Sequence, residues 1–289
     1  MIGATDTFLT SDGVRLEYDD NGGDGIPLIL LHGWGQTRAM FREQRRLGDG
    51  RRIISVDFRG HGCSEKPDHG YRIARFAADL RDLIGHVGAD QVDVLGWSMG
   101  ASVIWSYLDL FGTERIRSII LVDQPAAVAA VPWMSATEQE DSGAIFPVAA
   151  LTQLSQDIHS DTTGAVTEAF VRGMFSGQPD PELWDFVARE IQKTPAAHAA
   201  TLLFDHGAQN WLDVLPRINR PTLVIGCDGS HVPADSQRFI ADRIPGATLH
   251  VFGDDVARSH FPFLENPRAF NAVIERFLDR VDADQFARS

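Results

Sequence analysis

The most constraining feature of the sequence is a serine flanked by two glycines, in Gly96-Trp97-Ser98-Met99-Gly100. An apolar run precedes it at Val92–Leu95, and an amphipathic segment follows at Ala101–Phe111. The glycines allow a sharp turn from strand to helix without a clash from a Cβ atom, and such a turn exposes the serine hydroxyl. The start of the following helix also favours developing negative charge. This context predicts that Ser98 is a nucleophile; the alternative is a purely structural turn in a Rossmann-like protein.

Short apolar runs alternate with helical patterns through most of the chain. The runs that predict strands are Val14–Tyr18, Pro27–Leu31, Arg52–Val56, Val92–Leu95, Ile119–Val122, Thr222–Ile225 and Thr248–Phe252. Helical periodicity is found at Phe76–Val87, Ala101–Phe111 and Pro267–Val281. Continuous apolar strands separated by helices indicate an α/β fold with a mostly parallel, doubly wound sheet that is covered on both faces.

This alternation is interrupted after Ile119–Val122. Residues 125–215 contain no convincing buried strand and are rich in alanine with helical periodicity. We therefore predict that residues 1–124 and 216–289 form the core, and that residues 125–215 form a helical cap over the carboxyl ends of the strands. Large side chains of this segment either line an apolar substrate pocket or pack within the cap itself: Trp133, Met134, Phe146, Phe175 and Trp184.

A serine nucleophile needs a base, and the base needs a carboxylate that orients it. His260 is the best candidate for the base, because it lies between the last predicted strand and the last predicted helix. Asp123 directly follows the next strand after that of the nucleophile, so its carboxylate is expected at the same sheet edge as Ser98. Asp228, after Thr222–Ile225, is the competing acid, and either choice keeps the chain order Ser, Asp, His.

Several motifs resemble those of the α/β-hydrolase superfamily, over nearly the whole chain outside the insertion. They are His32-Gly33-Trp34-Gly35, Asp57-Phe58-Arg59-Gly60-His61-Gly62-Cys63-Ser64, the Ser98 turn, Pro221-Thr222-Leu223-Val224-Ile225-Gly226 and Ser259-His260-Phe261. The resemblance implies the α/β-hydrolase fold but says much less about the substrate. It also implies that the backbone N–H groups of Trp34 and Met99 form the oxyanion hole, which stabilises the oxygen of a tetrahedral intermediate.

The sequence departs from the family at the usual position of the acid. Many members carry the acid three residues after the glycine that ends the Pro-Thr-Leu-Val-Ile strand, with a proline four residues further on. Gly226 and Pro233 keep this frame, but Gly229 occupies the acid's position and Asp228 is one residue out of register. A known variant of the family places the acid after the preceding strand, where Asp123 lies. We therefore favour Asp123 over Asp228.

The formal net charge of −14 argues against nucleic acid or an anionic membrane as a partner, because both attract basic surfaces. No apolar run is long enough to span a membrane and residues 1–6 lack a signal-peptide pattern, which predicts a cytoplasmic protein. No metal-ligand spacing or phosphate-binding loop occurs, so we expect neither a metal nor another cofactor. The expected partner is a small hydrophobic substrate, and no pattern predicts the oligomeric state.

Together these features predict a serine hydrolase that cleaves a carboxylic ester or lactone of a fairly hydrophobic small molecule through an acyl-enzyme. A second hypothesis is a cofactor-independent dioxygenase that cleaves a hydroxyquinolone-type ring with a His–Asp dyad. That group resembles the chain in placing its acid after the same strand as Asp123, but it typically has histidines in place of Gln36 and Met99. Haloperoxidase-like and C–C-hydrolysing activities, or a non-catalytic ligand receptor on the same fold, are further hypotheses.

Overall fold

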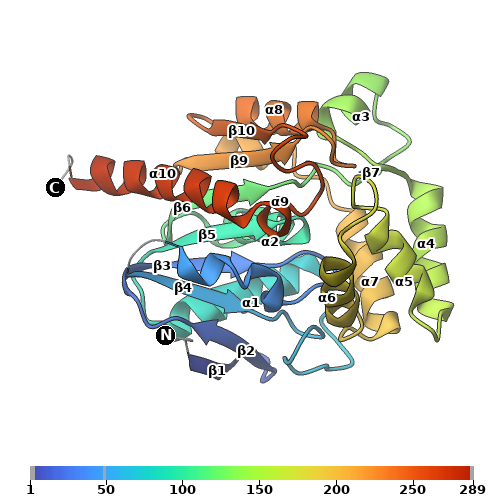
Figure 1. Ribbon diagram of the computed structural model, residues 1–289, viewed down its shortest axis with the longest axis horizontal. Coiled ribbons are helices and arrows are strands. Elements are labelled where there is room, and N and C mark those ends of the chain that lie inside the picture. The colour runs from blue at the N-terminus through green and yellow to red at the C-terminus, as the bar shows by residue number, and fades with distance from the viewer. Residues whose placement is uncertain (1–3, 48–49, 287–289) are drawn as a thin grey trace.

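The computed structural model describes residues 4–47 and 50–286, and its core is a sheet with helices on both faces (Figure 1). The sheet has eight strands in the order β1-β2-β4-β3-β5-β6-β9-β10. The strands are β1 Ala4–Leu9, β2 Arg15–Asp20, β3 Asp24–Leu31, β4 Arg51–Val56, β5 Val92–Trp97, β6 Ile116–Val122, β9 Thr222–Cys227 and β10 Thr248–Phe252. The pairs β1–β2 and β2–β4 are antiparallel and all other neighbours are parallel, which confirms the predicted α/β class.

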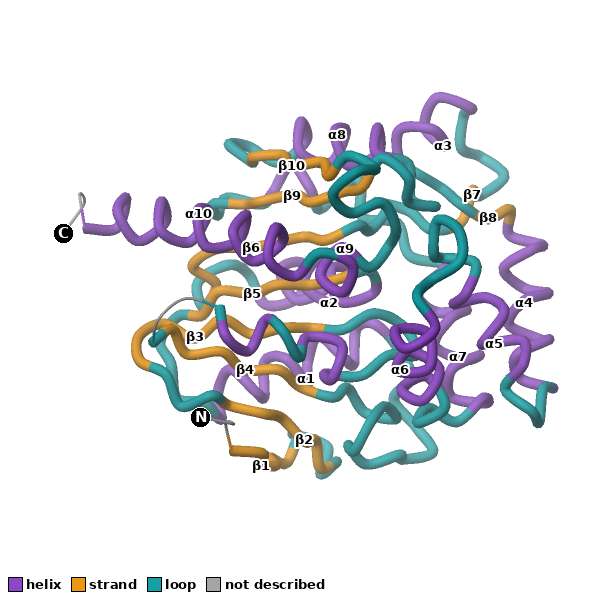
Figure 2. The backbone as a smooth tube through the Cα atoms, in the orientation of Figure 1, coloured by secondary structure: helices purple, strands orange, loops and turns teal. Residues whose placement is uncertain are grey.

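The helices of the core are α1 Ile73–His86, α2 Met99–Phe111, α8 Ala234–Arg243, α9 Pro262–Glu265 and α10 Pro267–Phe286. In Figures 1 and 2, α10 crosses in front of the sheet, whereas α1, α2 and α8 lie behind it. Strands β5 and β6 are buried along their whole length, because helices cover both faces. None of the helices in the described residues is long and apolar enough to cross a membrane.

Every strand predicted from the sequence is present, with ends that differ by a few residues. Within the eight-stranded sheet, β1 is the strand that the sequence patterns do not predict. It forms the edge of the sheet, and Phe8 is its one buried residue. A strand with one buried side chain lacks the apolar run by which the other strands are identified.

The residues between β6 and β9 form a mostly helical segment. Its elements are β7 Ala129–Ala130, α3 Ala136–Ser142, β8 Phe146–Pro147, α4 Val148–Ser160, α5 Ala165–Arg172, α6 Pro181–Ile191 and α7 Ala196–Gly207. Helices α4 to α7 lie together at the right in Figure 1, whereas α3 packs against α8. The helical segment therefore lies mainly at one end of the sheet rather than on either face.

Candidate active site

Ser98 lies at the carboxyl end of β5, on the turn that leads into α2. Its backbone has a φ of 53° and a ψ of −127°, a conformation that is costly for a residue other than glycine. Packing explains both neighbouring glycines. A Cβ atom on Gly96 would lie 2.4 Å from the backbone of Gly100, and one on Gly100 would lie 2.2 Å from the carbonyl oxygen of Leu31 in β3. The turn therefore depends on the two glycines of the motif.

Asp123 occupies the equivalent place on the neighbouring strand β6. Trp97 of β5 lies opposite Val122 of β6, and Ser98 and Asp123 are the residues that follow them. Within the described residues, Ser98 and Asp123 are also the only non-glycine residues with positive φ, at 53° and 51°. The amide of Asp123 donates to the carbonyl oxygen of Ile225 in β9 over 2.8 Å. Two strained residues are thus held at the carboxyl edge of the sheet, as is common in active sites.

His260 lies in the loop between β10 and α9. Its Nδ1 atom is 2.7 Å from Oδ2 of Asp123, and both side chains are buried. The indole N–H of Trp97 donates to the carbonyl oxygen of His260 over 2.8 Å, which holds the loop in place. Ser98 and His260 line the same cavity. The structure therefore brings the three predicted catalytic side chains to one site.

The competing acid, Asp228, is exposed, and its amide donates to the carbonyl oxygen of Phe252 in β10. Two residues later, the hydroxyl of Ser230 donates to Oδ2 of Asp123 over 2.5 Å. The loop after β9 thus supports the carboxyl group of Asp123 instead of supplying one to His260. This geometry favours Asp123 as the partner of His260.

Burial dominates the electrostatics of the Asp123–His260 pair. It raises the pKa of Asp123 above its usual value, and the hydrogen bond from Ser230 and the nearby His231 ring oppose that rise. Burial lowers the pKa of His260. With the carboxyl group ionised, the short contact needs a proton on Nδ1, so Nε2 is left as an acceptor. This is the tautomer that a general base beside a serine needs.

The family resemblance assigns the oxyanion hole to the amides of Trp34 and Met99. The turn that carries Trp34 lies against the nucleophile, since a Cβ atom on Gly33 would be 3.2 Å from Cβ of Ser98. His32 holds this turn, because its Nδ1 is 2.8 Å from the carbonyl oxygen of Gly33 and its Nε2 accepts from a backbone amide of the next loop. In the described residues, neither predicted amide donates a hydrogen bond to another protein group. Both are available to a substrate oxygen, and the oxyanion hole stays a prediction.

The cavity at Ser98 is small and mostly apolar. Its volume is about 30 Å³. Its apolar wall comes largely from the helical segment: Val128, Ile145, Phe146, Phe170, Met174 and Leu203. Its polar wall consists of Ser98, Gln124, His206, His231 and His260, together with the indole of Trp34. The cavity therefore suits an apolar group with few polar contacts.

The structure separates the two roles considered for the large side chains of the helical segment. Of the five side chains considered, only Phe146 belongs to the wall of this cavity among the described residues. Trp133 is 82% exposed and cannot line a pocket there. Phe175 and Trp184 pack on each other, with ring centroids 6.3 Å apart, as the alternative of packing within the segment requires. Apolar composition alone does not tell these two roles apart.

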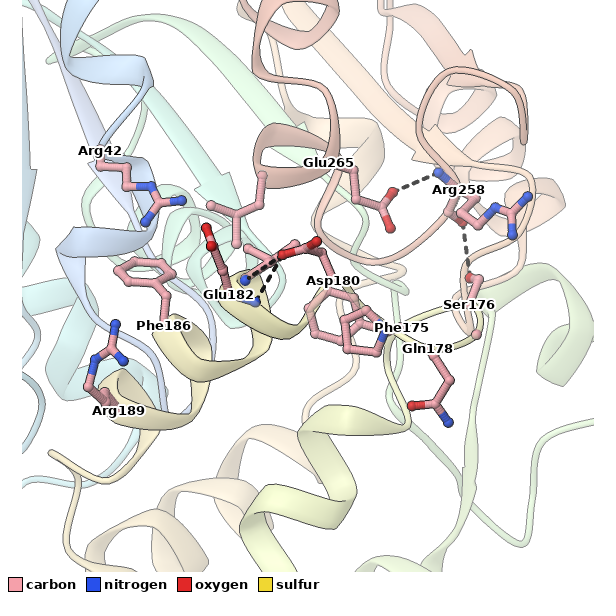
Figure 3. A pocket seen from close by; sticks show the side chains of 14 residues that line it. Arg42, Phe175, Ser176, Gln178, Asp180, Glu182, Phe186, Arg189, Arg258 and Glu265 are labelled. Atoms are coloured by element: carbon pink, nitrogen blue, oxygen red, sulfur yellow. Dashed lines mark hydrogen bonds between the residues drawn. The ribbon is translucent and has the colours of Figure 1, made fainter.

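A larger cleft of about 690 Å³ lies next to residues 174–177, which we call the strap (Figure 3). Met174 lines the cavity, and the three residues after it line the cleft. The hydroxyl of Ser176 donates to the carbonyl oxygens of Gly229 and Arg258, which fastens the strap over the loops after β9 and β10. Charged side chains of both signs line the cleft: Arg42, Asp180, Glu182, Arg189, Arg258 and Glu265. The strap thus forms the wall between an apolar cavity and a polar cleft.

Four polar side chains of the site are absent from the sequence predictions: Gln124, His206, Ser230 and His231. Ser230 and His231 lie between Gly226 and Pro233. The family resemblance expects the acid in this loop, so the sequence did indicate that the loop belongs to the site. The His231 ring centroid is 4.6 Å from that of His260. His206 lies in α7, within an alanine-rich helical pattern that gives it no distinguishing feature.

Comparisons with known proteins agree with this geometry. A sequence profile described as "alpha/beta hydrolase fold" matches residues 26–267. The chain is 30% identical over 255 residues to the non-heme chloroperoxidase CPO-A1 of Kitasatospora aureofaciens, which covers 84% of this chain and 88% of that protein. It is 27% identical over 279 residues to 3-oxoadipate enol-lactonase 2 of Acinetobacter baylyi, covering 94% of this chain and 96% of that protein.

Among solved structures, an esterase from Exiguobacterium antarcticum is similar in fold, with a TM-score of 0.83 at 23% sequence identity. The match covers 96% of this chain and 98% of the esterase. The profile spans most of the chain and includes Ser98, Asp123 and His260. The chain therefore belongs to the α/β-hydrolase fold family and is an enzyme of that family.

Proposed function

We propose that the protein hydrolyses a carboxylic ester or lactone of an uncharged, fairly hydrophobic small molecule through an acyl-enzyme on Ser98. The observation that carries the proposal is the 2.7 Å hydrogen bond between His260 and Asp123, beside a cavity that His260 shares with Ser98. The described residues that line this cavity include no Lys, Arg, Asp or Glu, which supports an uncharged substrate. Relatives named as an enol-lactonase and an esterase support the reaction class.

In the proposed reaction, Oγ of Ser98 attacks the carbonyl carbon while Nε2 of His260 takes the hydroxyl proton. Asp123 keeps Nδ1 protonated and stabilises the imidazolium that forms. The amides of Trp34 and Met99 donate to the oxyanion, and the loss of one such donor typically costs about 3 kcal/mol. His260 then gives the proton to the leaving alcohol. Water attacks the acyl-enzyme by the same route, which releases the acid and restores Ser98.

Turnover and covalent labelling test this proposal together. We expect the wild-type protein to hydrolyse members of a panel of p-nitrophenyl esters and lactones of graded size. We also expect a serine-reactive phosphonate to label one site, Ser98, and Ser98→Ala to lose both turnover and labelling. If the wild-type protein neither hydrolyses any member of the panel nor reacts with the phosphonate, the proposal is contradicted. Oxygen consumption with a hydroxyquinolone that survives Ser98→Ala would favour the dioxygenase hypothesis instead.

We further propose that residues 125–215 act as a cap over this site. Support comes from the cavity wall, to which the segment contributes Val128 directly before β7, Phe146 in β8 and Leu203 on α7. A crystal structure of the phosphonate adduct tests this role, because the bound group should contact these side chains. An adduct that contacts residues of the core alone would contradict it.

Ser230→Ala is expected to move the acid limb of the pH profile of kcat/KM to higher pH. The Ser230 hydroxyl stabilises the ionised carboxylate, so its removal raises the pKa of Asp123, and the Asp123–His260 pair takes up its proton at a higher pH. We also expect kcat on the plateau to fall about tenfold, because a hydrogen bond to a charged group is lost. Ser230→Thr keeps the hydroxyl and is the control. An unchanged profile for Ser230→Ala would show that the contact has no such role.

A further inference from the structure

His206 is a buried polar side chain that the proposed mechanism does not use. It lies on α7 with 4% of its surface exposed, and it lines the Ser98 cavity. Its Nδ1 atom has no hydrogen-bond partner in the described part of the chain. Burial lowers its pKa to about 3, so the ring is neutral at physiological pH. A neutral imidazole offers one donor and one acceptor, and leaving them unpaired in an apolar wall is costly.

Most other polar groups of the cavity wall already have partners or roles. The indole N–H of Trp34 donates to the carbonyl oxygen of Ala199 over 2.8 Å. The side-chain amide of Gln124 donates to the carbonyl oxygen of Pro125 over 3.0 Å. Ser98 and His260 carry the proposed reaction. The Nδ1 atom of His231 also has no hydrogen-bond partner in the described residues, but its ring packs edge-on against His260. This leaves His206 as the unpartnered ring of the wall that is not packed against a group of the proposed reaction in the described part of the chain.

We propose that His206 binds an uncharged oxygen of the substrate, an oxo or hydroxyl group on the acyl chain away from the reacting carbonyl. This inference rests on the proposed ester or lactone hydrolysis and names the substrate class more closely. A neutral imidazole can donate to a ketone or accept from a hydroxyl. A carboxylate in the same place would be buried without a counter-charge, since the described wall contains neither Lys nor Arg.

The proton that His260 gives to the leaving alcohol indicates which part of the substrate His206 would contact. His260 protonates the leaving alcohol, so the alcohol part lies toward His260 and the His231 ring beside it. His206 belongs to α7, the helix whose Ala199 accepts the indole N–H of Trp34. Trp34 carries one of the two amides predicted to bind the oxyanion of the acyl carbonyl. A polar group further along the acyl chain is thus within the region that α7 lines.

Matched ester pairs test this inference. The substrates are the p-nitrophenyl esters of 4-oxopentanoate and pentanoate, and of 5-oxohexanoate and hexanoate. We expect wild type to prefer the oxo ester in at least one pair, by kcat/KM. His206→Leu should lower that oxo-to-parent ratio about tenfold, because the hydrogen bond to the oxo group is lost. His206→Gln keeps a donor and an acceptor and should retain part of the preference.

Leu203→Met, one turn earlier on α7, is the matched control, because it changes the cavity wall without changing its polarity. It should affect both members of a pair alike. A wild type without any oxo preference, or a His206→Leu variant with an unchanged ratio, would overturn the inference while leaving ester hydrolysis intact. Failure of wild type to hydrolyse any of the four esters would instead contradict the proposed function, and this inference with it.

Discussion

Asp123→Ala is expected to lower kcat for ester hydrolysis about 10⁴-fold, whereas Asp228→Ala should change it by no more than about twofold. Asp123 accepts the Nδ1 proton of His260 and is buried, so its removal frees the ring from its orientation and leaves the imidazolium without a nearby charge. Asp228 is exposed and follows the strand as a turn residue. Steady-state kinetics on both variants decides between the two acids.

Asp123→Asn separates the orientation of the base from the charge that stabilises it. Ser230 and His260 both donate to the same carboxylate atom, Oδ2. An asparagine oxygen in the place of Oδ2 keeps both hydrogen bonds, so Nδ1 stays protonated and only the charge is lost. We therefore expect a loss of about 10²-fold, smaller than for Asp123→Ala.

The double variant Asp123→Asn, Ser230→Ala is the sharper comparison. Without the Ser230 donor, the amide is free to turn its NH₂ group toward His260, which favours the wrong tautomer and should deepen the loss. Equal kinetics for the single and double variants would show that Ser230 does not orient this position. An inactive Asp228→Ala beside an active Asp123→Ala would reject Asp123 as the acid altogether.

The core of the site was predictable because each of its residues directly follows an element with a strong pattern. Ser98 and Asp123 come at the ends of adjacent apolar strands, and His260 lies between the last strand and the last helix. In a parallel sheet such positions meet at one edge, so chain order and strand order together bring the side chains close. The preference for Asp123 over Asp228 followed from the loop after β9, where Asp228 is one residue away from the position at which the family carries its acid.

The parts that were not predictable depend on contacts between segments far apart in the chain. His206 faces the cavity because of how α7 lies on the core, and its surrounding sequence reads as an ordinary alanine-rich helix. Trp133 shows the opposite error, since an aromatic residue in a cap predicts burial but this one is exposed. Side-chain direction in this segment is decided by tertiary packing, which single-sequence patterns do not contain.

Gly100→Ala is expected to lower the free energy of unfolding by about 3 kcal/mol. The new Cβ atom would lie 2.2 Å from the carbonyl oxygen of Leu31 and 3.1 Å from that of His32. Both contacts are with backbone, so no change of side-chain rotamer relieves them, and either β3 or the start of α2 must move. Chemical denaturation with urea measures the loss.

Gly85→Ala is the matched control, because the same change is made at an exposed position of α1 where a Cβ atom would meet nothing within 4 Å. There the better helix propensity of alanine should leave stability unchanged or raise it by up to about 1 kcal/mol. Equal stability of the two variants would mean that the turn at Ser98 tolerates a side chain at Gly100. Strand β3 also leads into the turn with Trp34, so displacing Leu31 moves the predicted oxyanion donor. The folded fraction of Gly100→Ala should therefore lose activity in addition to stability.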